Sequence, residues 1–195
     1  MKRLFDICAS LPALVLLSPL FLLISLLIVL GSKGGVFYRQ QRVGRNGKPF
    51  FLFKFRSMRP QSDTGSLITI GGRDSRITRE GYFLRKYKLD ELPQLLNIIR
   101  GDMSIVGPRP EVQRYVDLYT PEQKKVLSVR PGLTDWASIE YMDENELLGK
   151  SSDPEYTYIH EIMPAKLELN LRYIREASLI TDLKIIFLTI FKIFR

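Results

Sequence analysis

Residues 7–32 form an uninterrupted stretch without a charged side chain, and this stretch constrains the fold more than any other part of the chain. As one α-helix it would be roughly 39 Å long, enough to cross the hydrocarbon core of a bilayer. Pro19 lies near its middle, where it removes a backbone donor and clashes with the carbonyl of Val15. Ser18 can donate a hydrogen bond to a carbonyl freed by this break. The stretch therefore predicts two membrane helices joined by a break at Ser18-Pro19.

Basic residues flank both ends of this stretch, with Lys2 and Arg3 before it and Lys33 and Arg39 after it. Cytoplasmic loops are rich in Lys and Arg, so a helix that crossed the membrane would place one of these groups on the wrong side. A re-entrant segment, which enters the bilayer and returns, leaves both groups in the cytoplasm. Proline kinks also occur in spanning helices, so the residues by themselves leave both topologies open, with re-entry favoured.

The chain holds one cysteine, Cys8, and one histidine, His160, among 195 residues. These counts exclude a disulfide framework, a cysteine metal cluster and a His-rich metal site. The net charge of +8 indicates an anionic partner: nucleic acid, a phosphorylated substrate or an anionic membrane surface. Much of this charge follows the uncharged stretch, where the cations that precede the next acidic residue are Lys33, Arg39, Arg42, Arg45, Lys48, Lys54, Arg56 and Arg59.

A β-hairpin is predicted over residues 36–43 and 49–58, because Asn46-Gly47 between them is a strong hairpin signal. Alternation along the second strand puts three phenylalanines on one face and Lys54 and Arg56 on the other. The cationic face is either a solvated surface or a wall that faces an anion. The excess of cations in this region favours the wall.

The segment from Leu89 to Pro110 carries the strongest candidates for chemistry. It begins with two adjacent carboxylates, Asp90 and Glu91, and continues into an apolar helix that Gly101 is placed to end. Arg109 follows between two prolines, which fix φ and present the guanidinium from stiff backbone. A plainer interpretation stays open at this point, because an Asp before a helix is often an N-cap and an Arg between prolines is often part of a turn.

The C-terminal half is predicted to be mostly helical. A turn at Arg130-Pro131-Gly132 carries another arginine, and a helix that begins at Asp153-Pro154 is expected to be broken by Pro164. Ser178 can cap a final helix, residues 179–195, which is heavily apolar. That helix suits a position in the membrane interface, although a docking face for the N-terminal stretch or for a partner is the alternative.

Four ordered motifs carry a family resemblance that covers nearly the whole chain: FKFRSM at 53–58, LDELPQL at 89–95, GDMSIVGPRP at 101–110 and RPGLT at 130–134. They closely resemble the bacterial sugar transferase family, the monotopic polyprenol-phosphate phosphoglycosyl transferases. The chain looks like the minimal, catalytic-domain form of this family. Ser18-Pro19 matches the kink motif of the family and therefore strengthens the expectation of a re-entrant membrane segment.

The resemblance implies a two-step transfer of a phosphosugar from a UDP-sugar to undecaprenyl phosphate, with release of UMP. In that scheme Asp90 is the nucleophile that forms an aspartyl-phosphosugar, and Glu91 is its catalytic partner. Mg²⁺ is the expected cofactor, with Asp90 and Glu91 as its ligands, and the alternative role of Glu91 is to orient Asp90. A carboxylate that attacks a diphosphate needs nearby cations to neutralise the phosphate oxygens. The candidates for this role are Lys54, Arg56, Arg85, Arg109 and Arg130.

These implications define the expected architecture. The fold class is α/β, α+β-like: one integrated, mostly helical and membrane-associated domain with a small β-hairpin. Residues 1–32 form the re-entrant segment, residues 33–178 the catalytic domain, and residues 179–195 the interfacial helix. The expected place is the bacterial inner membrane, with the catalytic domain on its cytoplasmic face and no nucleic acid as a partner. Neither the sugar, the glycoconjugate pathway nor a homo-oligomer can be settled from the residues.

The chain departs from the family pattern at two places. The segment after RPGLT begins Asp135-Trp136 where many members have Gly, and Asn170 stands where an Asp is frequent. The resemblance therefore implies no particular sugar for this chain.

Three other classes of protein share part of these features. A Mg²⁺-dependent membrane lipid phosphatase would share the cations and the metal. A membrane scaffold without catalysis would explain the apolar ends alone. A nucleic-acid binder would explain the positive charge but not the Asp-Glu pair.

Overall fold

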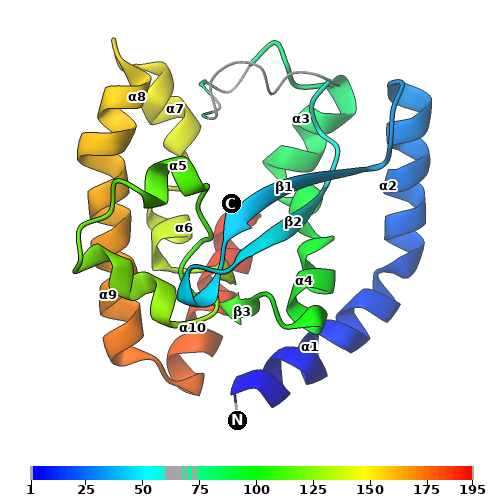
Figure 1. Cartoon of the computed structure of the whole chain (residues 1–195). Coiled ribbons are helices and arrows are strands. Elements are labelled where there is room, and N and C mark those ends of the chain that lie inside the picture. Colours follow the sequence, from blue (N-terminus) through cyan, green and yellow to red (C-terminus); the bar gives the residue numbers. More distant parts are fainter. Residues whose placement is uncertain (1, 60–67, 69, 72–73, 195) are drawn as a thin grey trace.

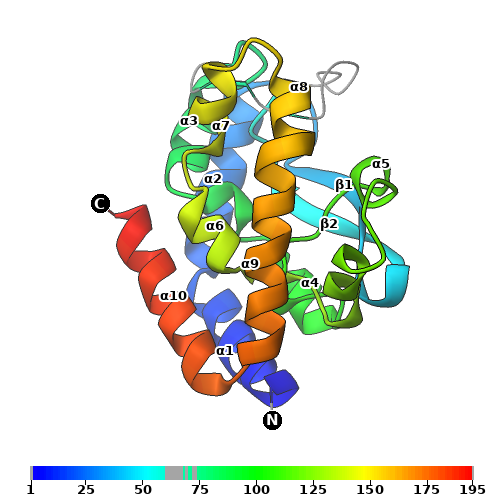
Figure 2. The same cartoon turned by 90° about the vertical axis from the view of Figure 1, so that its left-hand side faces the viewer.

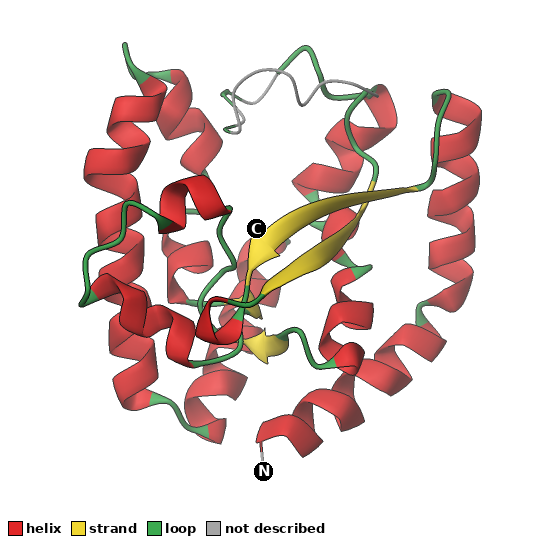
Figure 3. Cartoon of the chain, in the orientation of Figure 1, coloured by secondary structure: helices red, strands yellow, loops and turns green. Residues whose placement is uncertain are grey.

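The computed structural model describes residues 2–59, 68, 70–71 and 74–194. It is mostly helical with two small two-stranded sheets, which confirms the coarse fold class (Figures 1 and 3). The helices are α1 Lys2–Leu16, α2 Ser18–Gly31, α3 Arg79–Lys86, α4 Gln94–Arg100, α5 Gln113–Val116, α6 Trp136–Glu140, α7 Glu144–Gly149, α8 Pro154–Thr157, α9 Met163–Glu176 and α10 Leu179–Ile193. The strands are β1 Phe37–Val43, β2 Pro49–Phe55, β3 Ser104–Val106 and β4 Gly132–Thr134.

The uncharged N-terminal stretch is broken where the sequence predicts. Helix α1 ends at Leu16 and α2 begins at Ser18, with Pro19 in the first turn of α2, where a missing N–H costs little. The pair is bent by 59°. Among the described residues no helix taken alone has both the length and the apolarity to cross a membrane, whereas α1 and α2 together meet that test on length and composition.

The start of α1 is fastened to the rest of the domain by polar contacts. Lys2 Nζ donates to the Tyr173 hydroxyl at 2.9 Å and to Asp182 on α10 at 2.5 Å. Arg3 donates to the carbonyl oxygens at the end of α4. Asp6 is buried and accepts hydrogen bonds from the Ser104 hydroxyl and from a neighbouring backbone N–H on β3. The basic residues before the uncharged stretch are therefore structural contacts as well as flanking charges.

The predicted hairpin forms, with β1 antiparallel to β2 and the turn at Asn46-Gly47. Both turn residues have positive φ, 58° at Asn46 and 76° at Gly47, which explains the choice of an Asn-Gly pair. The phenylalanine face is buried unevenly: Phe55 is enclosed by α2 and Leu84 of α3, while Phe51 is 57% exposed. The hairpin is held to α4 by Asn97, whose amide bonds the backbone of Phe51 and Phe53.

The C-terminal helices differ from expectation at one point. Pro164 does not break the chain's helical course, because a π turn over Tyr158–Ile162 joins α8 directly to α9. Pro164 then lies in the first turn of α9, where its missing N–H is tolerated. The prediction of a break at Met163-Pro164 is therefore wrong. Figure 2 shows α9 as a long vertical element in front of the sheet region.

The final helix begins as predicted, with the Ser178 hydroxyl accepting a hydrogen bond from the N–H of Thr181. One face of α10 is buried through Asp182 and Ile185 against the core. The opposite face leaves large apolar residues exposed, including Ile180, Phe187, Ile190, Phe191 and Phe194. Helix α10 thus docks on the domain and still presents an apolar surface.

Candidate active site

Asp90 and Glu91 lie in a single 3₁₀ turn, Leu89–Glu91, that precedes α4. Lys88 enters this turn in the left-handed conformation, with φ of 56°, which redirects the chain after α3. Helix α4 is not capped by either carboxylate: its N-cap is Pro93, without a side-chain hydrogen bond. This excludes the capping interpretation for α4, yet both acids are buried, with Asp90 only 3% exposed and Glu91 8%.

Glu91 is locked by two cations. Both terminal nitrogens of Arg109 donate to its two carboxylate oxygens, and Lys54 Nζ donates at 3.0 Å. Burial alone would raise the pKa of Glu91, but Arg109 and Lys54 hold that pKa well below its usual value. Glu91 in turn raises the pKa of Arg109. Burial lowers the pKa of Lys54, although its contact with Glu91 opposes this.

Arg109 is positioned through its backbone as well as its side chain. Its N–H donates to the fully buried carboxylate of Asp135 at 3.1 Å, and the other oxygen of Asp135 caps α6 through the N–H of Ser138. The short parallel pair β3–β4 brings these two segments together. The contact is close at Gly132, where a Cβ would lie 2.1 Å from the backbone N of Gly107.

Asp90 is placed differently from Glu91. Its Oδ1 atom is buried and has no hydrogen-bond partner in the part of the chain that the structure describes. Burial raises the pKa of Asp90 above its ordinary value, against the opposing effect of Lys54 and with a further increase from Glu91. A carboxylate oxygen that is buried and unpartnered is costly, so this atom of Asp90 does not stabilise the fold through contacts with the described residues.

A cavity of about 310 Å³, within the size range of ligand sites, is lined by Lys54 and Arg109. Asp90 and Glu91 are not among its lining residues, but Lys54 and Arg109 both hold Glu91, so Glu91 lies next to the cavity wall. Of the predicted phosphate-binding cations, the structure brings together Lys54, Arg56, Arg85 and Arg109 at this cavity. Further cations in its lining are Arg42, Arg59, Arg76 and Lys166.

Two of the predicted cations have structural contacts. Arg56 donates to the carbonyl oxygens of Ile28, Ser32 and Lys33 at the end of α2, so its guanidinium fastens that helix to the cavity wall. Arg130 lies outside the described lining of the cavity and donates its Nε–H to the carbonyl of Gly101. The phosphate-binding roles of both residues stay predictions.

Glu111 is a site residue that sequence reasoning missed. Its carboxylate accepts hydrogen bonds from Arg42 at 2.9 Å, from the Tyr158 hydroxyl at 2.5 Å and from the N–H of Val112 at 2.8 Å. These contacts join β1, the segment after Arg109 and the π turn in one wall of the cavity. Burial raises the pKa of Tyr158 well above its usual value, and Glu111 adds to this rise. Glu111 directly follows the Leu89–Pro110 segment that carries the candidate residues, and this position is the sequence signal that could have identified it.

The donor set limits what metal the site can hold. No group of three His, Cys, Asp or Glu side chains gathers within residues 2–59, 68, 70–71 and 74–194. Magnesium commonly takes only one or two carboxylates and completes its shell with water and substrate phosphates. Asp90, with an oxygen free of partners among the described residues, fits this pattern. Glu91 does not present a free oxygen, so its predicted metal-ligand role stays a prediction that its contacts do not support.

Comparison with known proteins gives one family and close relatives. The family model for the bacterial sugar transferase matches residues 1–195. The UDP-glucose:undecaprenyl-phosphate glucose-1-phosphate transferase of Escherichia coli K12 is 39% identical over 196 residues, which cover 98% of this chain and 40% of that protein. An N-acetylgalactosaminephosphotransferase of Aeromonas hydrophila, whose name gives UDP-N-acetylgalactosamine and undecaprenyl phosphate, is 38% identical over 97% of this chain and 42% of its own length. The uncharacterized sugar transferase EpsL of Bacillus subtilis is 38% identical, over 99% of this chain and 87% of that protein. The chain thus spans about two fifths of the length of the first two relatives.

Proposed function

The chain belongs to the bacterial sugar transferase family, and from that premise we propose that it transfers a sugar phosphate from a UDP-sugar to undecaprenyl phosphate, with release of UMP. The names of the relatives from Escherichia coli and Aeromonas hydrophila support this donor and acceptor class. The observation that carries the proposal is the asymmetry of the acid pair beside a cationic cavity. Asp90 has a buried, unpartnered oxygen among the described residues, while Glu91 is held by Arg109 and Lys54.

In the proposed first step, a carboxylate oxygen of Asp90 attacks the phosphorus that carries the sugar. A new oxygen–phosphorus bond forms, and the bond from that phosphorus to the bridging oxygen breaks. The electron pair of the broken bond leaves with UMP. The product on the protein is an aspartyl-phosphosugar, a mixed anhydride of a carboxylate and a phosphate ester.

In the second step, a phosphate oxygen of undecaprenyl phosphate attacks the same phosphorus. The bond to Asp90 breaks and its electron pair restores the carboxylate, which leaves undecaprenyl-diphosphate-sugar as the product. Charge balances in both steps without any proton transfer. This scheme therefore needs no general base, in keeping with a chain that has a single histidine.

Charge neutralisation is the main task left to the rest of the site. Arg109 and Lys54 line the cavity and contact Glu91, which supports the proposal that they bind diphosphate oxygens while Glu91 fixes their positions. Arg85 on α3 also faces the cavity, and its charge lowers the pKa of Asp90 against the effect of burial. Both effects favour an ionised nucleophile next to neutralised phosphates.

Mg²⁺ is the proposed cofactor, held by Asp90 together with oxygens of the substrate. When bound, it would neutralise charge on the diphosphate. Glu91 is proposed as a positioning residue, because its oxygens are committed to Arg109 and Lys54. Of the two roles left open for Glu91, this proposal drops the metal ligand and keeps an orienting role, here towards the two cations.

The α1–α2 pair is proposed to enter one leaflet of the bacterial inner membrane and return, with the catalytic domain on the cytoplasmic face. The bend of 59° at Ser18-Pro19 and the exposed leucines of α2 support this topology. The exposed apolar face of α10 would lie in the membrane interface on the same side. This arrangement would hold the cavity at the depth of the lipid phosphate.

The topology gives a first expected result. Single cysteines placed before Met1 and at position 33, in a Cys8→Ser background, should both resist a membrane-impermeant maleimide in intact cells and react after permeabilisation. Pro19→Ala should restore a continuous helix and shift part of the population to a spanning form. Pro12→Ala is the matched control, because Pro12 lies inside α1 without breaking it. Labelling of the N-terminal cysteine alone in intact cells would show a spanning helix instead.

The proposed activity is tested by UMP release. The purified full chain in detergent, with Mg²⁺ and undecaprenyl phosphate, is offered UDP-glucose, UDP-N-acetylgalactosamine and other UDP-sugars. We expect multiple turnovers of UMP with at least one donor and a matching sugar–lipid product. Inorganic phosphate released from undecaprenyl phosphate without a sugar–lipid would indicate a lipid phosphatase, and no product with any donor would indicate a scaffold.

A further inference from the structure

One face of α9 forms a wall of the 310 Å³ cavity. Its lining residues are Met163, Lys166, Leu167 and Asn170, which recur at helical spacing. The hairpin β1–β2 contributes lining residues from another side, among them Lys54. Figure 1 shows α9 at the left of the view and the hairpin running across its middle. The cavity therefore has a hairpin side, which carries Lys54, one of the cations proposed to bind phosphate. It also has an α9 side, which carries apolar and amide side chains together with Lys166.

The lining next to α9 also carries carboxylates. Glu144 pairs with Lys166 of α9 at 2.6 Å, and Glu111 accepts from the Tyr158 hydroxyl just before α9 and from Arg42 of the hairpin. Carboxylates repel phosphate oxygens but accept hydrogen bonds from hydroxyl groups. A sugar offers several hydroxyl donors, whereas a uracil ring offers a single N–H. This side of the cavity is thus better matched to the sugar of a nucleotide sugar than to its phosphates or its base.

The aromatic rings on this side are already covered by protein. The Tyr158 ring packs against Tyr115, with centroids 4.9 Å apart, and the ammonium of Lys166 lies 5.6 Å from the centre of the same ring. The Tyr158 hydroxyl is committed to Glu111. These contacts make the Tyr158 ring a poor platform for stacking a base.

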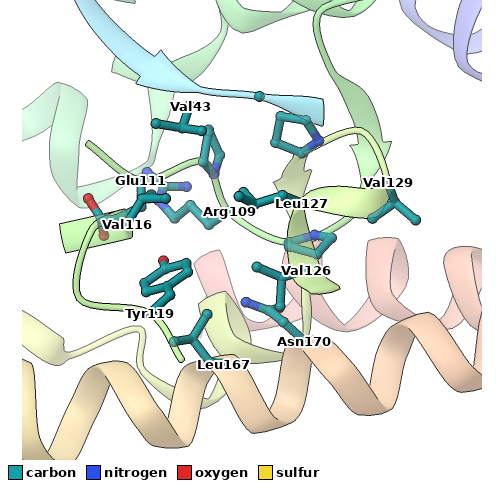
Figure 4. A pocket seen from close by; sticks show the side chains of 14 residues that line it. Val43, Arg109, Glu111, Val116, Tyr119, Val126, Leu127, Val129, Leu167 and Asn170 are labelled. Atoms are coloured by element: carbon teal, nitrogen blue, oxygen red, sulfur yellow. The ribbon is translucent and has the colours of Figure 1, made fainter. Parts of the chain in front are cut away.

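Asn170 stands out within this wall. It is 4% exposed, and its Oδ1 atom is buried without a hydrogen-bond partner among the residues that the structure describes. It also lines a second, small cavity of about 20 Å³ together with Arg109 (Figure 4). In that view Asn170 and Leu167 rise from α9 towards the segment that carries Arg109. A buried amide oxygen without a partner is costly unless a ligand or a bound water supplies the donor.

We propose that Asn170 is a sugar-recognition residue, whose side-chain oxygen accepts a hydrogen bond from a hydroxyl or amide N–H donor of the sugar in the UDP-sugar. The inference rests on the proposed function and adds to it the part of the cavity that reads the sugar. The sugar is attached to the phosphorus that Asp90 attacks, and Arg109 connects the Asp90–Glu91 turn to the neighbourhood of Asn170. Asn170 therefore discriminates donors without contacting the reacting atoms.

The test compares binding of UDP with binding of UDP-glucose and of UDP-N-acetylgalactosamine, measured by calorimetry on the full chain. An Asp90→Asn background stops transfer during the measurement. In that background we expect at least one of the two UDP-sugars to bind more tightly than UDP. Asn170→Ala should reduce this preference by roughly 3- to 10-fold, the value of one hydrogen bond, and leave UDP affinity unchanged. Asn170→Asp keeps an acceptor oxygen, so this variant should still prefer the UDP-sugar over UDP, even if its affinities for both ligands fall.

The controls separate this inference from the proposed function. Glu168→Gln changes an exposed residue of α9 and should leave every affinity unchanged. If Asn170→Ala weakened UDP and UDP-sugar binding equally, Asn170 would contact the base or the diphosphate instead. If the preference for the UDP-sugar over UDP were unchanged, Asn170 would have a structural role only. Either result overturns the inference. Equal binding of UDP and both UDP-sugars before the Asn170 change would overturn it too. The proposed function would survive all three results if the wild type releases UMP.

Discussion

Asp90→Asn is expected to reduce UMP release by about 10³-fold or more and, at the same time, to raise the melting temperature. The loss of activity follows because an amide is too weak a nucleophile against a diphosphate. The gain in stability follows because the native protein buries a carboxylate oxygen without a partner among the described residues. Removal of roughly 1 kcal/mol of this cost would raise the melting temperature by about 2–4 °C in a chain of this size.

The pH dependence of this gain has a definite sign. The folded-state pKa of Asp90 is raised above that of the unfolded chain, about 3.9, so the protonated acid is compatible with the fold and ionisation costs stability. The difference in melting temperature between Asp90→Asn and wild type should therefore be smallest below about pH 4. It should grow as the pH rises through the raised pKa and then stay constant.

Glu91→Gln provides the matched control for this experiment. The pKa of Glu91 is held well below its usual value by Arg109 and Lys54, so its charge contributes stability above about pH 4.3 that is lost as the pH falls through the depressed pKa. Its amide variant should melt at a lower temperature than wild type at pH 7. If Asp90→Asn also lowered the melting temperature at pH 7, Asp90 would be a stabilising partner and not a residue held ready for reaction.

Arg109→Lys is expected to lower kcat/KM by about 10²-fold even though the positive charge is kept. Arg109 holds both oxygens of Glu91 with two nitrogens of one rigid fork, and its backbone is fixed by Asp135. An ammonium cannot reproduce this two-point contact, so Glu91 would lose one of its hydrogen bonds. The lysine ammonium would also no longer be held in the orientation proposed for binding the diphosphate.

Steady-state kinetics and thermal melting check this second result. Arg114→Lys is the control, because Arg114 forms an exposed pair with Glu155. Near-normal turnover of Arg109→Lys would show that local positive charge alone is sufficient, and the geometric argument for the fork would then be wrong.

The parts of the fold set by short-range signals could be predicted. The positive φ values at Asn46 and Gly47 require the residues found there, and Gly101 ends α4 with φ of 94°. The helix break at Ser18-Pro19 is likewise local, because Pro19 takes the first turn of α2, where its missing N–H costs little. Each of these features depends on residues within one turn of backbone.

The parts of the site that depend on tertiary contacts could not be predicted from the sequence. Asp90 and Glu91 are neighbours in sequence, yet Lys54 and Arg109 approach only Glu91 closely enough to bond it, and this leaves an oxygen of Asp90 without a partner among the described residues. Arg56 shares the positive charge of Lys54, but its terminal nitrogens donate to carbonyls at the end of α2, such as that of Ser32. Sequence shows which residues are cationic, and the fold decides whether each meets a carbonyl, a carboxylate or a cavity.

The π turn at Tyr158–Ile162 and the parallel pair β3–β4 also lacked sequence signals. The turn places Tyr158 against Glu111, and the strand pair places Asp135 under Arg109. Both contacts join segments more than twenty residues apart. These two features shape the cavity wall that recognition of a substrate would use.

The covalent step can be measured on the protein itself. Wild-type protein is mixed with Mg²⁺ and a UDP-sugar that supports turnover, without undecaprenyl phosphate, and its intact mass is recorded alongside the UMP released. We expect one UMP per protein at most, a mass increase equal to one phosphosugar on the peptide that contains Asp90, and loss of this mass when undecaprenyl phosphate is added. No adduct, together with UMP release that requires both substrates at once, would show direct displacement by the lipid phosphate and would contradict a nucleophilic role for Asp90.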